Sequence, residues 1–290
     1  MPRTASDLVS LFDLEATAPD VFRGGSLDNG WKRVFGGQVL AQALVAAQRT
    51  VDNRTPHSLH AYFILAGDPT LPILFEVERI RDGRSFTTRR VVAKQRDAAI
   101  FVSAFSFQTD EAGLEHSLPM PSAPAPDTLA GPDQLAAFAG PQAGEQLWAF
   151  FDRIKPIDLR PIDLGRYVPA PDGKPREPKQ SLWIRIAGRL PDDPAIHRAA
   201  LLYLSDMTLL DTALVAHNTT IFSGKIQGAS LDHAFWLHRP CRADEWLLYV
   251  QDSPNANGAR GLTRGLLYAR SGALVASVAQ EGLMRLRNSR

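Results

Sequence analysis

The chain repeats one order of predicted elements on either side of a proline-rich segment. Residues 118–144 hold six prolines among Ala, Gly and Ser, a composition that disfavours regular helix and strand. On each side, one Ala- and Leu-rich helical segment precedes a set of β-patterned runs. The helices are predicted at 37–50 and 199–214, and the strands at 57–65, 74–80, 85–94 and 99–108, then at 229–238, 245–251, 261–269 and 273–285. This order predicts two tandem units, each one helix with an antiparallel sheet, and therefore the α+β class.

The repeat also divides the chain into domains. Ser58-Leu59-His60 follows the first helix much as Ser230-Leu231-Asp232 follows the second. One sheet wrapped on one helix leaves a face and an edge uncovered, and a second copy can cover both. We therefore expect a first domain at 1–117, a linker at 118–145 and a second domain at 146–290.

The charge balance and the cysteine content exclude several classes of protein. Lys and Arg number 32 against 31 Asp and Glu, so the chain lacks the bulk positive charge typical of nucleic-acid or acidic-membrane binding. Cys241 is the only cysteine, which rules out an intramolecular disulfide framework and a cysteine-rich metal site. No run of about 18 apolar residues could span a membrane, and residues 1–20 lack the basic start and apolar stretch of a signal peptide. We expect a cytoplasmic protein whose partner is a small molecule.

One carboxylate interrupts the apolar face of the second predicted helix. At about 100° per residue, Asp206 lies among Leu202, Tyr203, Leu209 and Leu210. An ionised carboxylate costs several kcal/mol to bury unless hydrogen bonds or charges compensate. Two interpretations are open at this point, a core Asp satisfied by hydrogen bonds and a general base with a raised pKa.

Six blocks of sequence, in order and almost from end to end, carry a resemblance to a known family. They are Val34-Phe35-Gly36-Gly37-Gln38, His57 to Phe63, Arg81 to Phe86, Met120 to Asp127, Asp232 to Pro240 and Ala279 to Arg285. Together they resemble the acyl-CoA thioesterase II family. The resemblance implies a double hot-dog fold, in which each half is a long helix wrapped by an antiparallel sheet. It also implies hydrolysis of acyl-CoA to free acid and CoA, with no metal or organic cofactor.

The resemblance also assigns candidate catalytic residues. In the family, an Asp, a Thr or Ser, and a Gln together activate a water molecule. By position these residues match Asp206, Ser230 and Gln280, with Ser230 standing where some members have Thr. The segment from Ile64 to Asp68 lacks the Arg-Pro of some members. Any contact that this Arg makes with CoA phosphates must be made otherwise here.

The chemistry of thioester hydrolysis suits these three residue types independently. A carboxylate within hydrogen-bond reach of water can act as general base, and neutral Ser or Gln side chains can orient the water without competing for its proton. By the two-residue period of a strand, Gln280 points to the same face as Ala276 and Val278. The alternative interpretations are a core Gln satisfied by the backbone and an ordinary strand serine at Ser230.

The glycine pair before the first helix is the candidate binding group for the thioester oxygen. Free amides at a helix N-terminus suit an oxyanion, so the Gly37 amide or its neighbour is expected to polarise the substrate carbonyl. The alternative is that Gly36 and Gly37 only allow close helix packing. The helix predicted at 37–50 contains no Asp or Glu, which predicts one active site per chain.

Other motifs and functions carry less weight. The chain has no G-x-S-x-G, H-E-x-x-H, P-loop or G-x-G-x-x-G motif. Residue pairs such as Asp232 with His233, and His57 with His60, diverge on a strand, so we interpret them as structural. Two alternative functions stay open, a hot-dog enoyl-CoA hydratase or dehydratase and a non-catalytic acyl-CoA binding module. Exposed sheets of such folds often pair, so a homo-oligomer is expected.

Overall fold

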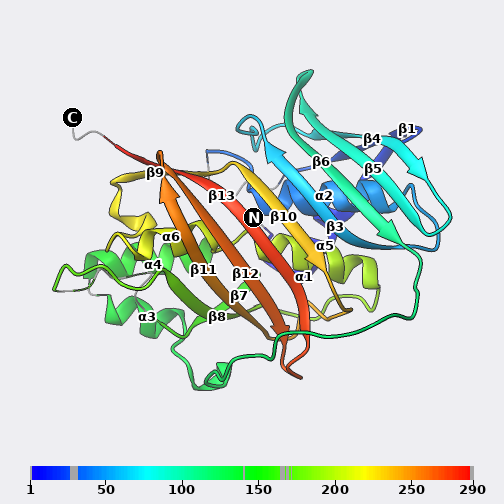
Figure 1. Cartoon of the computed structure of the whole chain (residues 1–290). Helices are drawn as coiled ribbons and strands as arrows, with labels where there is room; N and C mark the ends of the chain where they lie inside the picture. The colour runs from blue at the N-terminus through cyan, green and yellow to red at the C-terminus, as the bar shows by residue number, and fades with distance from the viewer. Residues whose placement is uncertain are drawn as a thin grey trace.

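The strands of the chain form one continuous antiparallel sheet. The computed structural model describes residues 2–26, 32–139, 141–163, 167, 170 and 172–287. Within these residues the 13 strands follow the order β1-β2-β4-β5-β6-β3-β10-β13-β12-β11-β8-β7, and β9 also pairs with β13. Figure 1 shows the strands as a curved layer with the helices α2 and α5 behind it. Mixed helix and antiparallel sheet agree with the predicted α+β class.

In the first half, the predicted helix and all four predicted strands are confirmed within two residues at each end. The elements are α1 (Ala5–Phe12), β1 (Glu15–Ala18), β2 (Val21–Gly24), α2 (Gly36–Gln48), β3 (Thr55–Phe63), β4 (Ile73–Asp82), β5 (Phe86–Gln95) and β6 (Ala98–Gln108). The loop between β5 and β6 places Arg96 and Asp97 at positive φ, as a tight hairpin turn requires. Helix α1 and strands β1 and β2 were not predicted from the sequence.

In the second half two strands precede a pair of helices, and five strands follow it. Its elements are β7 (Ile157–Pro161), β8 (Lys179–Ile186), α5 (Pro194–Ser205), α6 (Leu209–Val215), a short 3-10 turn η3 (Ile221–Ser223), β9 (Ile226–Ser230), β10 (Asp232–Leu237), β11 (Leu247–Asn257), β12 (Arg260–Ala269) and β13 (Leu274–Leu286). The single strand predicted at 229–238 is wrong, because the chain breaks at Leu231. There the Leu231 carbonyl accepts from the Phe63 amide, and the Leu231 amide donates to the Glu281 carbonyl.

The proline-rich segment is more regular than its composition predicts. A 3-10 turn η1 (Pro126–Thr128) and the helix α3 (Pro132–Phe138) lie inside it, and α4 (Pro141–Arg153) begins at its end. The prediction of a helix-poor linker is therefore wrong in part. Pro132 and Pro141 each open a helix, a position where the missing amide costs no hydrogen bond. In Figure 1 the chain leaves β6 and runs along the lower edge of the molecule towards α3.

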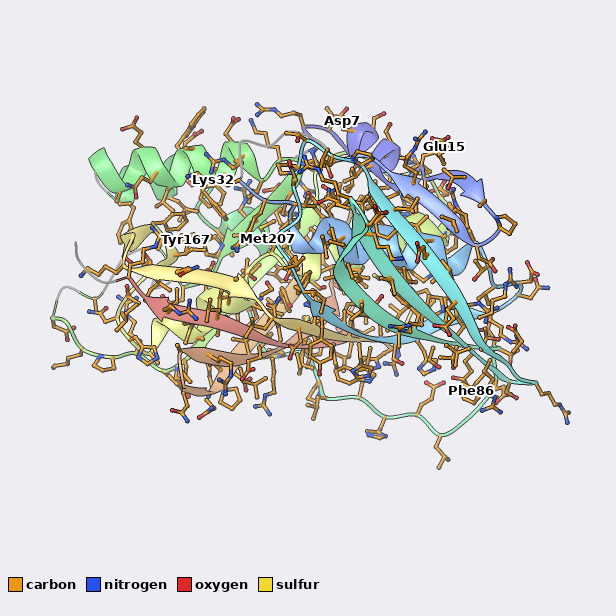
Figure 2. The ribbon with its side chains drawn as sticks, turned by 90° about the horizontal axis from the view of Figure 1, so that it is seen from above. Asp7, Glu15, Lys32, Phe86, Tyr167 and Met207 are labelled. Carbon is orange, nitrogen blue, oxygen red and sulfur yellow. The ribbon has the colours of Figure 1, made fainter. Side chains whose placement is uncertain are left out.

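Two extensive contacts, one between strands and one between helices, join the halves of the chain. Strand β3 pairs antiparallel with β10, so that Leu59 lies opposite Phe235 and Ala61 opposite His233. Behind the sheet, α2 packs against α5, and Leu40 and Leu204 are fully buried in the shared core. The view from above in Figure 2 shows the helices on one side of the sheet, with Met207 near the middle of the molecule. Asp206 lies where the two halves meet, because the backbone amide of Gly37, in the first half, donates to its carboxylate.

None of the helices formed by the described residues has the length and the apolar character needed to cross a membrane.

Candidate active site

Asp206 lies at a break between two helices. The continuous helix predicted at 199–214 is wrong, because α5 ends at Ser205 and α6 begins only at Leu209. Asp206 is the C-terminal capping residue of α5, with helical φ and ψ of −84° and −5°. Its carboxylate therefore projects from the end of a helix, where a break in the backbone lets other elements approach it.

A buried pair of glutamines satisfies the backbone at this break. Gln180 on β8 and Gln251 on β11 lie directly opposite each other, and the Gln180 amide donates to the Gln251 side-chain oxygen at 2.6 Å. Gln180 also donates to the Thr208 carbonyl at 3.1 Å, and Gln251 donates to the Thr208 hydroxyl. Buried carbonyls left without helical partners need such donors. The sequence signal for this support, two polar residues at inward strand positions, was missed.

The structure brings all four predicted site residues together. Gln280, from β13, donates its side-chain Nε2 to Asp206 Oδ1 at 2.6 Å. Ser230, at the end of β9, donates its hydroxyl to the same oxygen at 3.4 Å. The backbone amide of Gly37, in the first turn of α2, also donates to Asp206. Three elements from both halves therefore surround one carboxylate.

Burial makes this carboxylate an unusually strong base. The Asp206 side chain is 3% exposed. Burial raises its pKa to about 6, although hydrogen bonds from Gln280, Gly37 and Ser230 and the charge of Arg33 oppose the rise. At neutral pH the group is therefore still ionised, yet it binds a proton more tightly than an exposed Asp. A general base needs this combination.

The glycine pair has the packing role considered for it, and it also brings a backbone amide to Asp206. A Cβ at Gly36 would lie 2.6 Å from Asp206 Oδ2 and 2.9 Å from Phe63 Cζ. A Cβ at Gly37 would lie 2.6 Å from the Tyr203 carbonyl oxygen. Close packing of α2 on α5 thus requires glycine, and the same closeness delivers the Gly37 amide to Asp206. The role of that amide towards a thioester oxygen stays a prediction.

We expect Gly36→Ala to lower kcat/KM by between about 10- and 100-fold, because the new methyl group displaces Asp206 or Phe63 and misplaces the reacting groups. Gly113→Ala is the matched control, since a Cβ there would meet nothing within 4 Å. Steady-state kinetics on both variants, with melting temperatures to confirm folding, checks the expectation. Equal activity of the two variants would contradict it.

Comparisons with known proteins identify the family of this chain. Residues 27–108 match the model of the acyl-CoA thioesterase N-terminal domain, and residues 166–283 match that of acyl-CoA thioesterase. A curated relative, acyl-coenzyme A thioesterase 8 of Homo sapiens, is 38% identical over 97% of this chain and 89% of its own. The chain belongs to the acyl-CoA thioesterase family.

Solved structures of similar proteins extend the comparison to the fold. The acyl-CoA thioesterase II TesB2 of Mycobacterium marinum is 42% identical, with a TM-score of 0.79 over 97% of this chain and 99% of that one. A conserved protein of unknown function with a hot-dog fold, from Alicyclobacillus acidocaldarius, is 17% identical with a TM-score of 0.77 over 97% and 98% of the two chains. This member of the family therefore has a hot-dog fold.

The histidines singled out in the sequence lie apart from one another in this thioesterase family member. His57 contacts the Ser106 hydroxyl at 2.8 Å, whereas the ring of His60 packs edge-on against Trp236. Asp232 accepts from the Glu281 amide at 2.7 Å, away from His233. Among the described residues, no group of three or more His, Cys, Asp or Glu side chains is placed to hold a metal ion. Of these three histidines, only His233 lies beside Asp206, and this contact was not predicted from the sequence.

At the opposite end of the α2–α5 pair, the C-terminal end of α2 occupies the position that corresponds to Asp206 at the end of α5. The side chains there are different. There the Arg198 guanidinium donates to the side-chain oxygen of Gln48 at 2.9 Å. The adjacent cavity is only about 10 Å³ and is lined largely by apolar groups, including those of Leu44, Leu59 and Phe105. Such a volume holds about one water molecule.

Proposed function

We propose that the chain hydrolyses fatty acyl-CoA to free fatty acid and CoA through a water molecule activated by Asp206. The observation that carries the mechanism is the buried Asp206 carboxylate, with a pKa of about 6 and with Gln280 and Ser230 both bonded to Oδ1. Membership of the acyl-CoA thioesterase family supports the substrate. Because Gln280 and Ser230 both donate to Oδ1, we assign Oδ2 as the oxygen that accepts a hydrogen from the attacking water.

The reaction follows from these positions. Asp206 accepts a proton from water as the water oxygen attacks the thioester carbon, and negative charge develops on the former carbonyl oxygen. The N-terminal end of α2, at Gly36 and Gly37, supplies partial positive charge near this oxygen. When the carbon–sulfur bond breaks, the proton held by Asp206 goes to the thiolate of CoA. The products are a fatty acid and CoA thiol, and Asp206 is ionised again.

We also infer two hot-dog units, 1–117 and 146–290, joined by the segment 118–145. The pairing of β3 with β10 and the packing of α2 on α5 support a tandem arrangement of two similar units. The glycine end of α2 comes from one unit, and Asp206, Ser230 and Gln280 come from the other. The site would thus need both units.

The hydratase or dehydratase alternative requires a histidine that reaches the substrate. His233 is the histidine nearest to Asp206, with its Nδ1 at 3.8 Å from Asp206 Oδ1, but its side chain is 0% exposed. Its Nε2 lies 3.0 Å from the Ser205 hydroxyl oxygen and its Nδ1 faces the carboxylate, so neither ring nitrogen is directed towards an acyl chain. The geometry therefore favours hydrolysis over addition or removal of water.

Release of CoA thiol from a panel of acyl-CoA chain lengths tests the proposed function. We expect thiol release from fatty acyl-CoA, with activity unchanged by a metal chelator. Binding without thiol release would instead support the non-catalytic module, and hydration of an enoyl-CoA without thiol release would support the hydratase. Activity lost in chelator and restored by a divalent ion would contradict the metal-free mechanism.

We expect one active site per chain. The Asp206 end of the α2–α5 pair carries a base, whereas the other end carries Gln48 and Arg198 beside a cavity of about 10 Å³. Titration with a non-hydrolysable acyl-CoA analogue, followed by calorimetry, should therefore saturate at one molecule per chain. Saturation at two per chain would show that the end near Gln48 also binds substrate.

A further inference from the structure

His233 is a buried titratable residue that the proposed reaction does not use directly. It lies on β10, and its ring contacts two groups of the α5 terminus. Nδ1 lies 3.8 Å from Asp206 Oδ1, and Nε2 lies 3.0 Å from the Ser205 hydroxyl oxygen. Within the described part of the chain, Nδ1 has no hydrogen-bond partner. An unsatisfied buried nitrogen beside a catalytic carboxylate calls for an explanation.

The imidazole ring is neutral in this environment. Burial lowers the His233 pKa to about 3, so the ring carries a single proton at neutral pH. That proton sits on either Nδ1 or Nε2, and the other nitrogen is an acceptor. The two tautomers differ in what Nδ1 presents to Asp206. In one tautomer Nδ1 points an N–H towards Oδ1, and in the other it points a lone pair at Oδ1.

The Ser205 hydroxyl decides between the two tautomers. Its oxygen lies 2.8 Å from the Leu202 carbonyl oxygen and 3.0 Å from His233 Nε2, and its single hydrogen can be donated to only one of them. If the hydrogen goes to Leu202, Nε2 must be protonated and the Nδ1 lone pair faces the carboxylate. If it goes to Nε2, Nδ1 carries the proton and its N–H points towards Asp206.

An ionised Asp206 favours the second arrangement. A lone pair aimed at a buried carboxylate is repulsive, whereas an N–H aimed at it is attractive, and a low local dielectric enlarges the difference. Other groups around the site are Arg33, whose charge lowers the Asp206 pKa, and Tyr249, whose hydroxyl donates to the Ser205 carbonyl at 2.7 Å. Asp232, next to His233 in the chain, is bonded to the Glu281 amide. None of these contacts supplies a hydrogen to the space between Nδ1 and Oδ1.

We propose that His233 is a positioning residue. It is a neutral donor placed between the Ser205 hydroxyl and Asp206, and it keeps the catalytic carboxylate ionised and fixes its Oδ1. This inference rests on the proposed function, since Asp206 is the base there. The ring does not touch substrate and gains or loses no proton during turnover. Its effect is on the fraction of Asp206 that is ready to accept a proton from water. Loss of the donor raises the Asp206 pKa, because an N–H dipole directed at the carboxylate oxygen from 3.8 Å in a buried site favours the charged form.

The pH dependence of kcat/KM separates this role from a packing role. His233→Leu removes both nitrogens, and we expect the acidic limb of the profile to move up by about one pH unit. Activity relative to the unaltered protein then falls about 10-fold further at pH 5 than at pH 8. His233→Asn keeps an N–H near the position of Nδ1, so its acidic limb should return towards the original. A packing role alone lowers activity equally at all pH values and gives no rescue by Asn.

Nitrogen-15 NMR of the unaltered protein gives a reading that does not depend on activity. At pH 8 we expect the His233 signals, identified by their loss in His233→Asn, to show protonation at Nδ1. Protonation at Nε2 would overturn the proposal, as would an unmoved acidic limb in folded His233→Leu. If His233→Leu does not fold, Ser205→Ala should shift the limb in the same direction by a smaller amount, and no shift would count against the proposal. Failure of the proposed function would appear separately, as absent thiol release by the unaltered protein.

Discussion

Replacing Asp206 by asparagine is expected to lower kcat by at least about 100-fold and, at pH 8, to raise the melting temperature. The rate falls because the amide has nearly the same size but cannot accept the proton of the attacking water. The stability rises because the amide removes the cost of burying a charge. A pKa raised from 3.8 to about 6 corresponds to about 3 kcal/mol at pH values above 6.

The pH dependence of this stability gain has a definite sign. The pKa of Asp206 is higher in the folded than in the unfolded chain, so the folded chain holds more protons between pH 3.8 and about 6. The unaltered protein therefore loses stability from this group as the pH rises through that window. Above pH 6, the free energy of unfolding of Asp206→Asn should exceed that of the unaltered protein by the full difference of about 3 kcal/mol. The difference should vanish below pH 3.8.

Asp244→Asn is the matched control, because Asp244 is a buried carboxylate whose pKa is shifted in the opposite direction from that of Asp206. Burial raises the Asp244 pKa, but hydrogen bonds from the Arg242 side chain and the Leu190 amide outweigh it, and the pKa is lowered overall. This variant should lose stability at pH 8 and keep its activity. Denaturant unfolding at pH 4 and pH 8 together with kinetics checks both variants. An Asp206→Asn protein that is both active and less stable at pH 8 would show that Asp206 is a structural residue.

The sequence predicted the elements whose residues repeat with a clear period. The alternation in residues 86–95 and 98–108 marks strands that are buried on one face, and the Ala-rich run at 36–48 marks a helix buried nearly throughout. Short elements with ambiguous periods were missed. Helix α1 was one, although Thr4 and Asp7 form a capping box at its start, a signal that could have revealed it.

The candidate catalytic residues could be named from the sequence, but the support around them could not. The prediction of Asp206 came from an apolar pattern broken by one carboxylate, together with a family resemblance, and neither depends on the exact course of the helix. The break after Ser205 is set by long-range partners, because Gln180 and Gln251 bond Thr208 from strands far away in sequence. The approach of His233, on β10, to Asp206, at the end of α5, likewise joins two elements that are separate in sequence. Local propensity carries no information on either contact.

Replacing Gln280 by alanine is expected to lower kcat by about 10- to 100-fold, and Ser230→Ala by a smaller factor. The difference follows from geometry, because Gln280 donates to Asp206 Oδ1 at 2.6 Å and Ser230 at 3.4 Å. Gln280 Oε1 is also buried without a hydrogen-bond partner among the described residues, and we expect it to accept a hydrogen from the attacking water. Gln280→Ala thus removes both a donor to the base and an acceptor for the water.

The double variant Gln280→Ala, Ser230→Ala should lose less activity than the product of the two single losses. Both side chains act on one carboxylate and one water, and once that water is free to rotate, a second loss has little left to remove. The acidic limb of kcat/KM should also move to higher pH in Gln280→Ala, because its donor lowers the Asp206 pKa. Ser58→Ala, which removes a serine at the opposite end of the α2–α5 pair, is the control and should leave kcat unchanged. Fully multiplicative losses would mean that Gln280 and Ser230 act on separate steps, and the water would then need another group to hold it.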